Sequence, residues 1–304
     1  MATKNETRGI VLMAFGKQAY AKMAFNMAMS IKFHSPDIKI AFINDGSCIS
    51  AFLDYHYQYF DQIISIHKDD AYDNAGTKEE KLNPGKAKTR IYNYLPFDHN
   101  IYLDCDGAAM QPLEPLFDEC IAQGGFYKTQ VVGWHDVSKG RDFKEMQWAW
   151  FDEIVEHYNL PSDFTMPAIN SSFAYIKKCK ESEALFKQVI KNFDNPMSNL
   201  RMPWGATQPD ELYTNIALGQ LSVQCDLGLH PVYFNTHLVR DWAKVTKEHY
   251  VLGIFGGVGF SHSSITDMYD RLMHKYGKEN GMTHQWKSHI LMKDKHANTR
   301  AAMA

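Results

Sequence analysis

Asn100-Ile-Tyr-Leu-Asp-Cys-Asp-Gly107 is the stretch from which the fold and the site are predicted. Its apolar run ends in two carboxylates one residue apart, Asp104 and Asp106. Residues i and i+2 of a strand point to the same face, so both acids would point into one crevice. Such hard oxygen ligands suit Mg²⁺ or Mn²⁺. The other interpretation is a polar turn after a strand, because Asp and Gly favour turns.

Composition is that of a globular protein with a sizeable core, at 304 residues with 45% hydrophobic and 13% aromatic content. No apolar run approaches the roughly 18 residues needed to cross a bilayer, so no transmembrane segment is expected. The five cysteines are scattered and lack C-x-x-C spacing, which argues against a disulfide framework or a zinc knuckle. We therefore expect a cytoplasmic location.

Charge is unevenly spread along the chain, whose formal net charge is −3. From Arg271 onward, seven Lys/Arg residues stand against two acids. We expect a catalytic domain over residues 1–270 and a basic C-terminal tail over 271–304. Such a tail could touch an anionic partner, a lipid surface or DNA. A solvated terminal helix is the alternative.

The N-terminal pattern alternates strands with helices. Strands are expected at residues 10–15, 38–43 and 62–66, with helices at 19–33 and 48–59. This order predicts an α/β fold with a mostly parallel central sheet flanked by helices. Ligands bind at the carboxyl ends of such strands, so Asp45 would share an edge with Asp104 and Asp106.

The remaining pattern continues the alternation. Residues 69–85 are expected to form a loop, and residues 86–95 a helix that carries Lys88 and Arg90. A polar loop from Pro167 is expected to enter a strand ending at Ile176. Further helices are expected at 112–120, 142–157, 182–193 and 209–218, and further strands at 126–133, 221–225 and 231–234.

Taken together, residues 9–265 resemble the retaining GT-A glycosyltransferases of the glycogenin and bacterial galactosyltransferase type, glycosyltransferase family 8. The best segment runs from Lys88 to Gly107, where similar enzymes have a cationic residue, a helix, and then hydrophobic-Asp-x-Asp. The resemblance implies the GT-A fold. It also implies that Asp104 and Asp106 bind Mn²⁺ (or Mg²⁺) and the diphosphate of a UDP-sugar, and that Lys88, with Arg90 as substitute, contacts the donor.

Three further blocks carry the resemblance. Tyr20 matches an aromatic residue that stacks near the uracil. Ile169-Asn-Ser-Ser-Phe-Ala-Tyr is similar to Phe-Asn-(Ser/Ala)-Gly-Val, which makes Asn170 a candidate for the sugar pocket. Asp210-Glu-Leu-Tyr-Thr-Asn215 resembles the Asp-Gln-x-x-x-Asn segment that faces the reacting sugar.

At Glu211 the chain departs from the family, which has glutamine there. A carboxylate at this place could act as a nucleophile or stabilise an oxocarbenium-like transition state electrostatically. The alternative is that Asp210 and Glu211 only cap a helix.

His262 falls where the family places a third metal ligand, in His-x-x-Gly-x-x-Lys-Pro-Trp. This chain reads His262-Ser-Ser-Ile without Lys-Pro-Trp, so the lysine that clamps the diphosphate cannot be carried over. His237 is the rival for the third ligand.

The expected function is metal-dependent, retaining transfer of a sugar from a nucleotide donor, UDP-linked, to a hydroxyl acceptor. The acceptor would be a glycan, a lipid-linked sugar or a modified nucleic-acid base. One alternative is a haloacid-dehalogenase-like phosphatase, because hydrophobic-Asp-x-Asp-Gly also opens that family's nucleophile loop, usually near the start of its domain. Another is a non-catalytic protein that binds sugar nucleotides.

Overall fold

The computed structural model describes residues 6–136, 148–200, 208–228, 233–235, 249–253, 263–279, 287 and 291. The chain divides into two compact units. Unit 1 comprises residues 1–65, 101–122 and 231–304, and unit 2 comprises residues 66–100 and 123–230. Neither unit is therefore a single continuous piece of chain.

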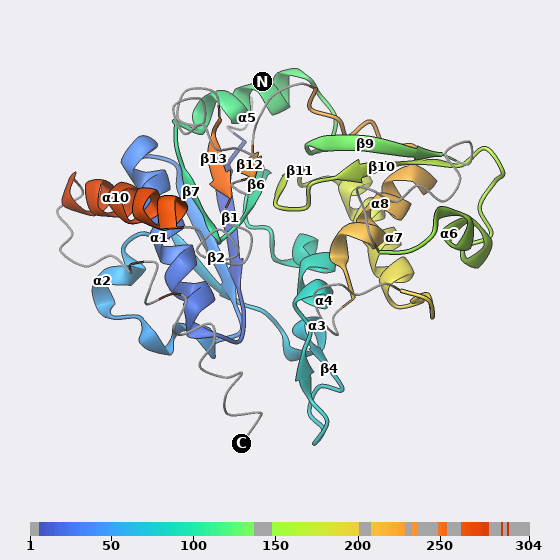
Figure 1. Ribbon diagram of the computed structural model, residues 1–304, viewed down its shortest axis with the longest axis horizontal. Coiled ribbons are helices and arrows are strands. Elements are labelled where there is room, and N and C mark those ends of the chain that lie inside the picture. Colours follow the sequence, from blue (N-terminus) through green and yellow to red (C-terminus); the bar gives the residue numbers. More distant parts are fainter. Residues whose placement is uncertain are drawn as a thin grey trace. The chain divides into compact units, whose positions relative to one another are not determined.

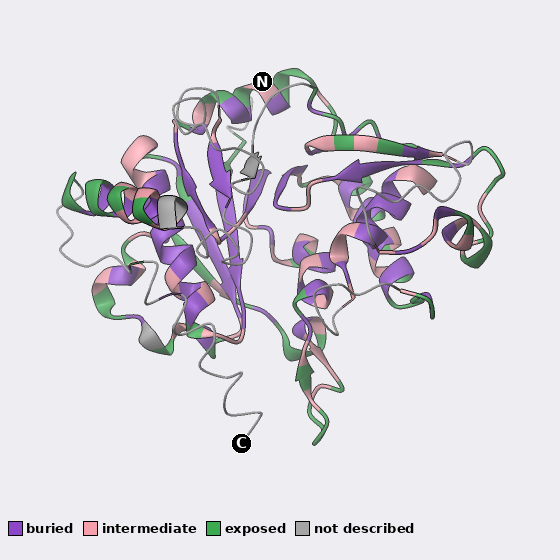
Figure 2. Cartoon of the chain, in the orientation of Figure 1, coloured by how far each residue is buried: buried purple, intermediate pink, exposed green. Residues whose placement is uncertain are grey.

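The sheet of unit 1 is built on parallel strands, of which β1 (Arg8–Ala14) and β2 (Lys39–Asn44) are buried. β1, β2 and β3 (Gln62–Ser65) pair in parallel, and β6 (His99–Asp104) lies next to β1. Residues 10–14 and 40–44 are all buried, as the colouring of Figure 2 shows. Continuous apolar runs of this kind are typical of parallel strands covered on both faces. The mixed α/β class with a largely parallel sheet flanked by helices is confirmed.

Two helices from the two ends of the chain lie side by side in unit 1. α1 (Gln18–His34) follows β1, and α10 (Ser263–Glu279) lies beside it (Figure 1). Asn26 Nδ2 of α1 donates to the Tyr269 hydroxyl of α10 at 3.0 Å. The rings of Phe33 and Tyr276 are 4.5 Å apart. The domain boundary expected after residue 270 falls inside α10.

A small three-stranded sheet follows the acidic pair. β7 (Gly107–Ala109) is antiparallel to β13 (Val251–Gly253), which is parallel to β12 (Tyr233–Asn235). A Cβ added at Gly107 would lie 2.5 Å from the backbone oxygen of Leu252. Only glycine therefore allows this approach of the two strands. Unit 1 also contains the 3₁₀ helix η1 (Cys48–Ala51) and the helices α2 (Asp54–Tyr57) and α5 (Glu114–Ala122).

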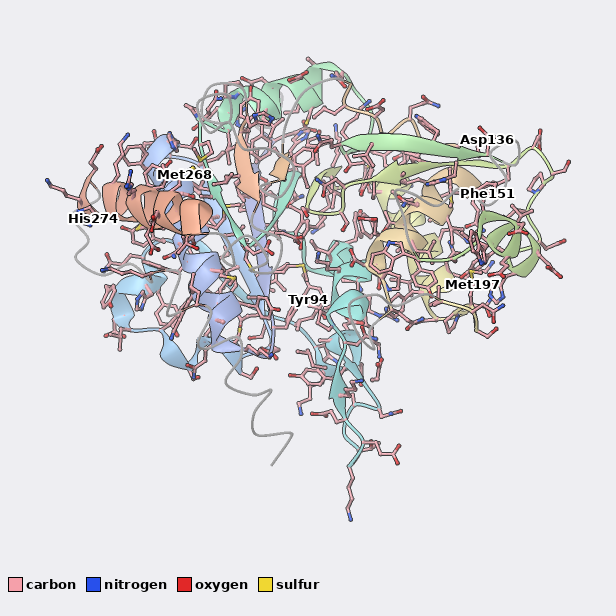
Figure 3. All side chains as sticks on the ribbon, viewed as in Figure 1. Tyr94, Asp136, Phe151, Met197, Met268 and His274 are labelled. Atoms are coloured by element: carbon pink, nitrogen blue, oxygen red, sulfur yellow. The ribbon has the colours of Figure 1, made fainter. Side chains whose placement is uncertain are left out.

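Unit 2 combines short antiparallel strand pairs with helices, of which the short α3 (Lys68–Ala71) comes first. β9 (Val131–Asp136) pairs with β10 (Thr165–Ile169), and β8 (Tyr127–Lys128) pairs with β11 (Phe173–Lys177). The longer helices described in this unit are α4 (Pro84–Thr89), α6 (Phe151–His157), α7 (Lys180–Phe193) and α8 (Asp210–Gln220). One core cluster joins α6, β10 and α8, and includes Phe151, Met166, Met197, Leu212 and Ile216. Figure 3 labels Phe151 and Met197 of this cluster.

Several expected elements differ in extent. The helix expected at 86–95 ends with α4 and is followed by the 3₁₀ helix η2 (Ile91–Tyr94), because Arg90 leaves the α region at φ −103° and ψ 7°. The loop expected at 69–85 contains the end of α3 (Lys68–Ala71) and the hairpin of β4 (Tyr72–Asp73) and β5 (Lys81–Leu82). The helix expected at 48–59 is two short helices, η1 and α2.

The strand expected at 221–225 is wrong. These residues form the turn that ends α8, where Ser222 N donates to Gly219 O at 3.1 Å and Val223 N to Leu218 O at 2.9 Å. Leu221 is exposed, and within the described part of the chain the backbone pairs only at a single bridge, where Thr129 N donates to Cys225 O at 2.8 Å. All five cysteines are free. Among the described helices, none is long and apolar enough to cross a membrane.

Candidate active site

The predicted site residues fall into two groups, one in each unit. Unit 1 carries Tyr20, Asp45, Asp104 and Asp106, and unit 2 carries Lys88, Arg90, Asn170, Asp210 and Glu211. The two candidate histidines, His237 and His262, lie outside the described residues.

The carboxylate turn, residues 104–106, leaves β6 with its acids on the accessible side. Asp104 and Asp106 are half-buried, whereas Cys105 between them is buried. β6 ends at Asp104, and Cys105 and Asp106 form a bend that leads into β7. The hydroxyl of Tyr102, two residues earlier on the same face, donates a short hydrogen bond to Asp104 Oδ1. The structure therefore keeps both carboxylates within reach of solvent.

The path of β7 shows which edge of the sheet the carboxylate turn occupies. A Cβ on Gly107 would meet Met27 of α1 at 3.4 Å, and Ala109 N donates to Ser30 Oγ at 2.8 Å. The chain thus follows α1 toward its C-terminus. Asp106, which precedes Gly107, lies toward the N-terminal half of α1, and α1 begins after the carboxyl end of β1. The edge is the one at which ligands bind in open α/β sheets.

Asp45 shapes the same edge. Its Oδ2 accepts from Gly16 N at 3.1 Å and from Ser47 Oγ at 2.8 Å, and its Oδ1 accepts from Ser47 N at 3.2 Å. Asp45 therefore ties the loop after β1 to the loop after β2. Tyr20 lies in the first turn of α1 and is half-buried. Donor binding by these two residues stays a prediction.

The carboxylate turn offers part of a metal site. Among the described residues, no group of three His, Cys, Asp or Glu side chains could hold a metal ion. Two carboxylates are the donor type that Mn²⁺ or Mg²⁺ takes together with water and phosphate oxygens. The turn thus fits a cation that completes its coordination with other ligands.

In unit 2, α4 and α8 bring a lysine next to an acid. Lys88 Nζ lies 4.0 Å from Asp210 Oδ2, and the two side chains are 24% and 23% exposed. The approach is close, because a Cβ on Gly85 in the first turn of α4 would lie 2.2 Å from Gln208 O. The helix starts of α4 and α8 therefore pack directly on each other.

Glu211 follows Asp210 and is held by donors from two other segments. Its Oε1 accepts from Trp148 Nε1 at 3.4 Å, and its Oε2 accepts from Ser171 N at 3.4 Å. Burial, followed by the charge of Asp210, raises the pKa of Glu211 from 4.5 to about 7. Hydrogen bonds from the Trp148 indole and from the backbone and side chain of Ser171 act in the opposite direction and lower this pKa. A carboxyl group that titrates near neutral pH in such a place is a candidate for chemistry.

Asn170 begins the turn between β10 and β11 that also supplies Ser171. Asn170 N donates to Gln130 O at 2.9 Å, and Asn170 Oδ1 accepts from Ser172 N at 3.1 Å. The turn therefore brings the Asn170 segment to the start of α8. Asn215, the last residue of the predicted Asp210–Asn215 block, is fully buried and accepts from Ile169 N at 3.3 Å.

Arg90 is engaged inside unit 2. Its Nη2 lies 2.7 Å from Asp194 Oδ1 and its Nε 3.5 Å from Asp70 Oδ1. The guanidinium also lies over the ring of Phe193 at 5.6 Å. Arg90 thus links the end of α4 to the end of α7 and stabilises the fold of unit 2.

The sequence did not predict the hydrogen-bond donors to Asp104 and Glu211. Trp148 and Glu211 are far apart in the sequence, and a backbone donor such as Ser171 N does not depend on the type of side chain. Tyr102 could have been found, because its position two residues before Asp104 places both on one strand face.

Comparison with known proteins gives fold likenesses only. No family model and no curated protein matches the chain. The solved structure of the galactosyltransferase LgtC in complex with donor and acceptor sugar analogues matches with a TM-score of 0.53 and 15% identity, over 88% of this chain and 95% of that one. A structure of LgtC with an active-site glutamine changed to glutamate has the same scores.

Two further glycosyltransferases share the fold. The bifunctional glycosyltransferase WbbM matches with a TM-score of 0.52 and 11% identity, over 91% of this chain and 50% of that one. The glycosyltransferase GlyE of Streptococcus pneumoniae TIGR4 matches with a TM-score of 0.52 and 13% identity, over 90% and 64%. The chain has the GT-A-like fold of these glycosyltransferases, and the phosphatase alternative finds no support.

Proposed function

We propose that the protein is a metal-dependent, retaining glycosyltransferase that moves a sugar from a UDP-sugar to a hydroxyl acceptor. The observation that carries the proposal is the carboxylate turn, two half-buried acids at the carboxyl edge of a sheet in a GT-A-like fold. Fold alone does not assign an activity, so the proposal depends on the chemistry of these side chains and of the start of α8.

Asp104 and Asp106 would hold Mn²⁺ or Mg²⁺ beside the diphosphate of the donor. When bound, the cation neutralises charge that grows on the leaving diphosphate. Lys88 is the cationic side chain proposed for the donor, since Arg90 is engaged in ion pairs with Asp70 and Asp194. Tyr20 is proposed to stack near the uracil, by resemblance alone.

The start of α8 would serve the reacting sugar. Asp210 and Glu211 would place negative charge where an oxocarbenium-like transition state develops positive charge, which a pre-oriented carboxylate stabilises. Ionised Glu211 also has the chemistry of a nucleophile. Asn170 is proposed to bind sugar hydroxyls. In one LgtC structure an active-site glutamine is changed to glutamate, and glutamine is the family's residue at the position of Glu211.

The proposed acceptor is a hydroxyl group of a glycan, a lipid-linked sugar or a modified nucleic-acid base. The basic residues after Arg271 are proposed to contact an anionic acceptor, on charge alone. A cytoplasmic location agrees with five free cysteines and is part of the proposal.

The test is Asp106→Ala, assayed for Mn²⁺-dependent hydrolysis of a panel of UDP-sugars. We expect a loss on the order of a hundredfold, because the variant lacks one of the two carboxylates proposed to hold the cation that neutralises the leaving diphosphate. Asp37→Ala is the matched control, since Asp37 is an exposed acid of the same unit. Undiminished turnover in D106A would overturn the proposal. Calorimetric binding of UDP-sugar without turnover would favour a non-catalytic binding protein.

A further inference from the structure

Two N–H donors meet the two oxygens of Glu211. Trp148 Nε1 faces Oε1 and Ser171 N faces Oε2, each at 3.4 Å. A carboxylate accepts at both oxygens, whereas a glutamine side chain would turn its NH₂ group onto one of the donors. The two N–H donors at residue 211 are therefore matched to a carboxylate, although burial and Asp210 disfavour its charge.

The charged groups around Glu211 do not supply a direct counter-ion among the described residues. Asp210 lies next to it in the same turn, and Lys88 approaches Asp210 at 4.0 Å. From β8, Tyr127 is buried, which raises its pKa, with smaller contributions from Cys225, Asp210 and Glu211. β10 contributes no titratable side chain.

α7 contacts α8 through neutral amides. Gln188 Nε2 and Asn192 Nδ2 each donate to Gln220 Oε1 at 2.9 Å. Against burial and the charge of Asp210, the opposing groups on Glu211 are thus the indole of Trp148 and the Ser171 segment.

Trp148 is fixed by its own packing. Its ring lies against the core cluster that includes Phe151, Met166 and Leu212, as does the ring of Trp150. The indole is a side-chain donor, so a substitution of Trp148 can remove it while Ser171 keeps both its backbone and its side-chain contact with Glu211. Trp150 offers the same ring in the same cluster and is not among the groups that shift the pKa of Glu211.

We propose that Trp148 is a positioning residue, whose indole N–H orients the Glu211 side chain and holds it as the carboxylate that acts on the reacting sugar. The assignment rests on the proposed function as far as the sugar is concerned. The orientation and ionisation of Glu211 stand on the geometry of unit 2 by itself.

The activity test compares the pH profiles of kcat/KM for UDP-sugar turnover. Activity of the wild type should rise as Glu211 ionises. Trp148→Phe removes a hydrogen-bond donor to the ionised Glu211. The midpoint of this rise in kcat/KM should therefore move to higher pH by on the order of one pH unit. Trp150→Phe should leave the midpoint unchanged, and Glu211→Gln should abolish the pH-dependent rise in kcat/KM. An equal loss at every pH in W148F, or an equal shift in W150F, would overturn the proposal.

The second test needs no turnover. In ¹³Cδ-glutamate NMR spectra, the Glu211 resonance is assigned by its absence in E211Q, and its titration midpoint is followed in W148F and W150F. A rise confined to W148F supports the proposal even if no sugar is transferred, which would then count against the proposed function alone. An unchanged midpoint overturns it. Trp148→Met is the second variant, with the same expected shift, should W148F fail to fold.

Discussion

Glu211 carries a charge that its surroundings disfavour, so its ionisation is linked to stability. Its pKa lies at about 7 in the folded chain, against an ordinary value of 4.5. Because the pKa of this acid is raised on folding, the contribution of Glu211 to the free energy of unfolding is fully present below pH 4.5. It is lost as pH rises through about 7.

Glu211→Gln should therefore stabilise the protein above pH 7 relative to the wild type. The gain should be up to about 3 kcal/mol, reduced where the amide NH₂ group faces a donor and where Glu211 is open to solvent. At pH 4.5 the advantage should disappear. Urea unfolding at pH 4.5 and pH 8 measures the difference in unfolding free energy between the variant and the wild type. An equal difference at both pH values would contradict the assigned titration.

Gly107 has a different task from the acids that precede it. Any side chain there would clash with Leu252 O at 2.5 Å, so the glycine of the Asp-x-Asp-Gly stretch serves the pairing of β7 with β13. The chemistry proposed for the carboxylate turn therefore depends on Asp104 and Asp106, while Gly107 sets how the chain leaves them.

At the scale of elements, Lys88 in α4 and Arg90 at its C-terminal end have different roles. Arg90 is buried and paired with Asp70 and Asp194, so Arg90→Ala should destabilise the protein by roughly 3 kcal/mol. Lys88 is more exposed and 4.0 Å from Asp210, so Lys88→Ala should cost less than about 1 kcal/mol.

The affinity for UDP-sugar should respond in the opposite order. K88A should weaken binding on the order of tenfold, because a charge-assisted contact to a phosphate is lost, and R90A should weaken it less. Calorimetry with UDP-sugar and Mn²⁺, beside urea unfolding of both variants, checks the pair. A binding loss confined to R90A would assign the donor contact to Arg90 instead.

The contact of α10 with α1 contains a histidine that resists protonation. Burial, followed by the charge of Lys275, lowers the pKa of His34 from 6.5 to about 4. His34 Nε2 lies 3.2 Å from the Tyr276 hydroxyl. Lys275 follows His274 on α10, and Figure 3 labels His274. A lowered histidine pKa gives stability that is fully present above pH 6.5 and is lost as pH falls through about 4.

His34→Gln should therefore reduce the loss of stability between pH 7 and pH 4. The variant keeps a polar side chain near Tyr276 and cannot become charged. Unfolding free energies at the two pH values provide the measurement, and His67→Gln is the control, because His67 is exposed. The idea fails if the wild type and H34Q lose the same stability on acidification.

At the scale of the whole molecule, the chain enters and leaves each unit more than once. Residues 1–122 contain β1, β2, β7 and α1 but lack β13 and α10, which pack on β7 and α1. We expect that neither residues 1–122 nor residues 123–304 unfold cooperatively when expressed alone. Urea titration followed by near-ultraviolet circular dichroism tests this. A sharp transition in either fragment alone would contradict it.

The local pattern of apolar residues predicted the strands and helices in which that pattern is regular. The strands near residues 10–15, 38–43 and 62–66 and the helix near 19–33 are confirmed with small changes at their ends. Pattern failed where tertiary contacts override it. Backbone bonds from residues 221–223 end α8, and the helix expected at 86–95 ends at Arg90, which forms ion pairs with Asp70 and Asp194.

The sequence by itself determined the α/β class, the carboxylate turn and the acidic start of α8, because periodicity and residue spacing are local properties. Only the tertiary structure decided which side chains meet. It pairs Lys88 with Asp210, commits Arg90 to a structural task, and surrounds Glu211 with Trp148 and Ser171 N. The shift in the pKa of Glu211 follows from that enclosure, because desolvation depends on groups far apart in sequence.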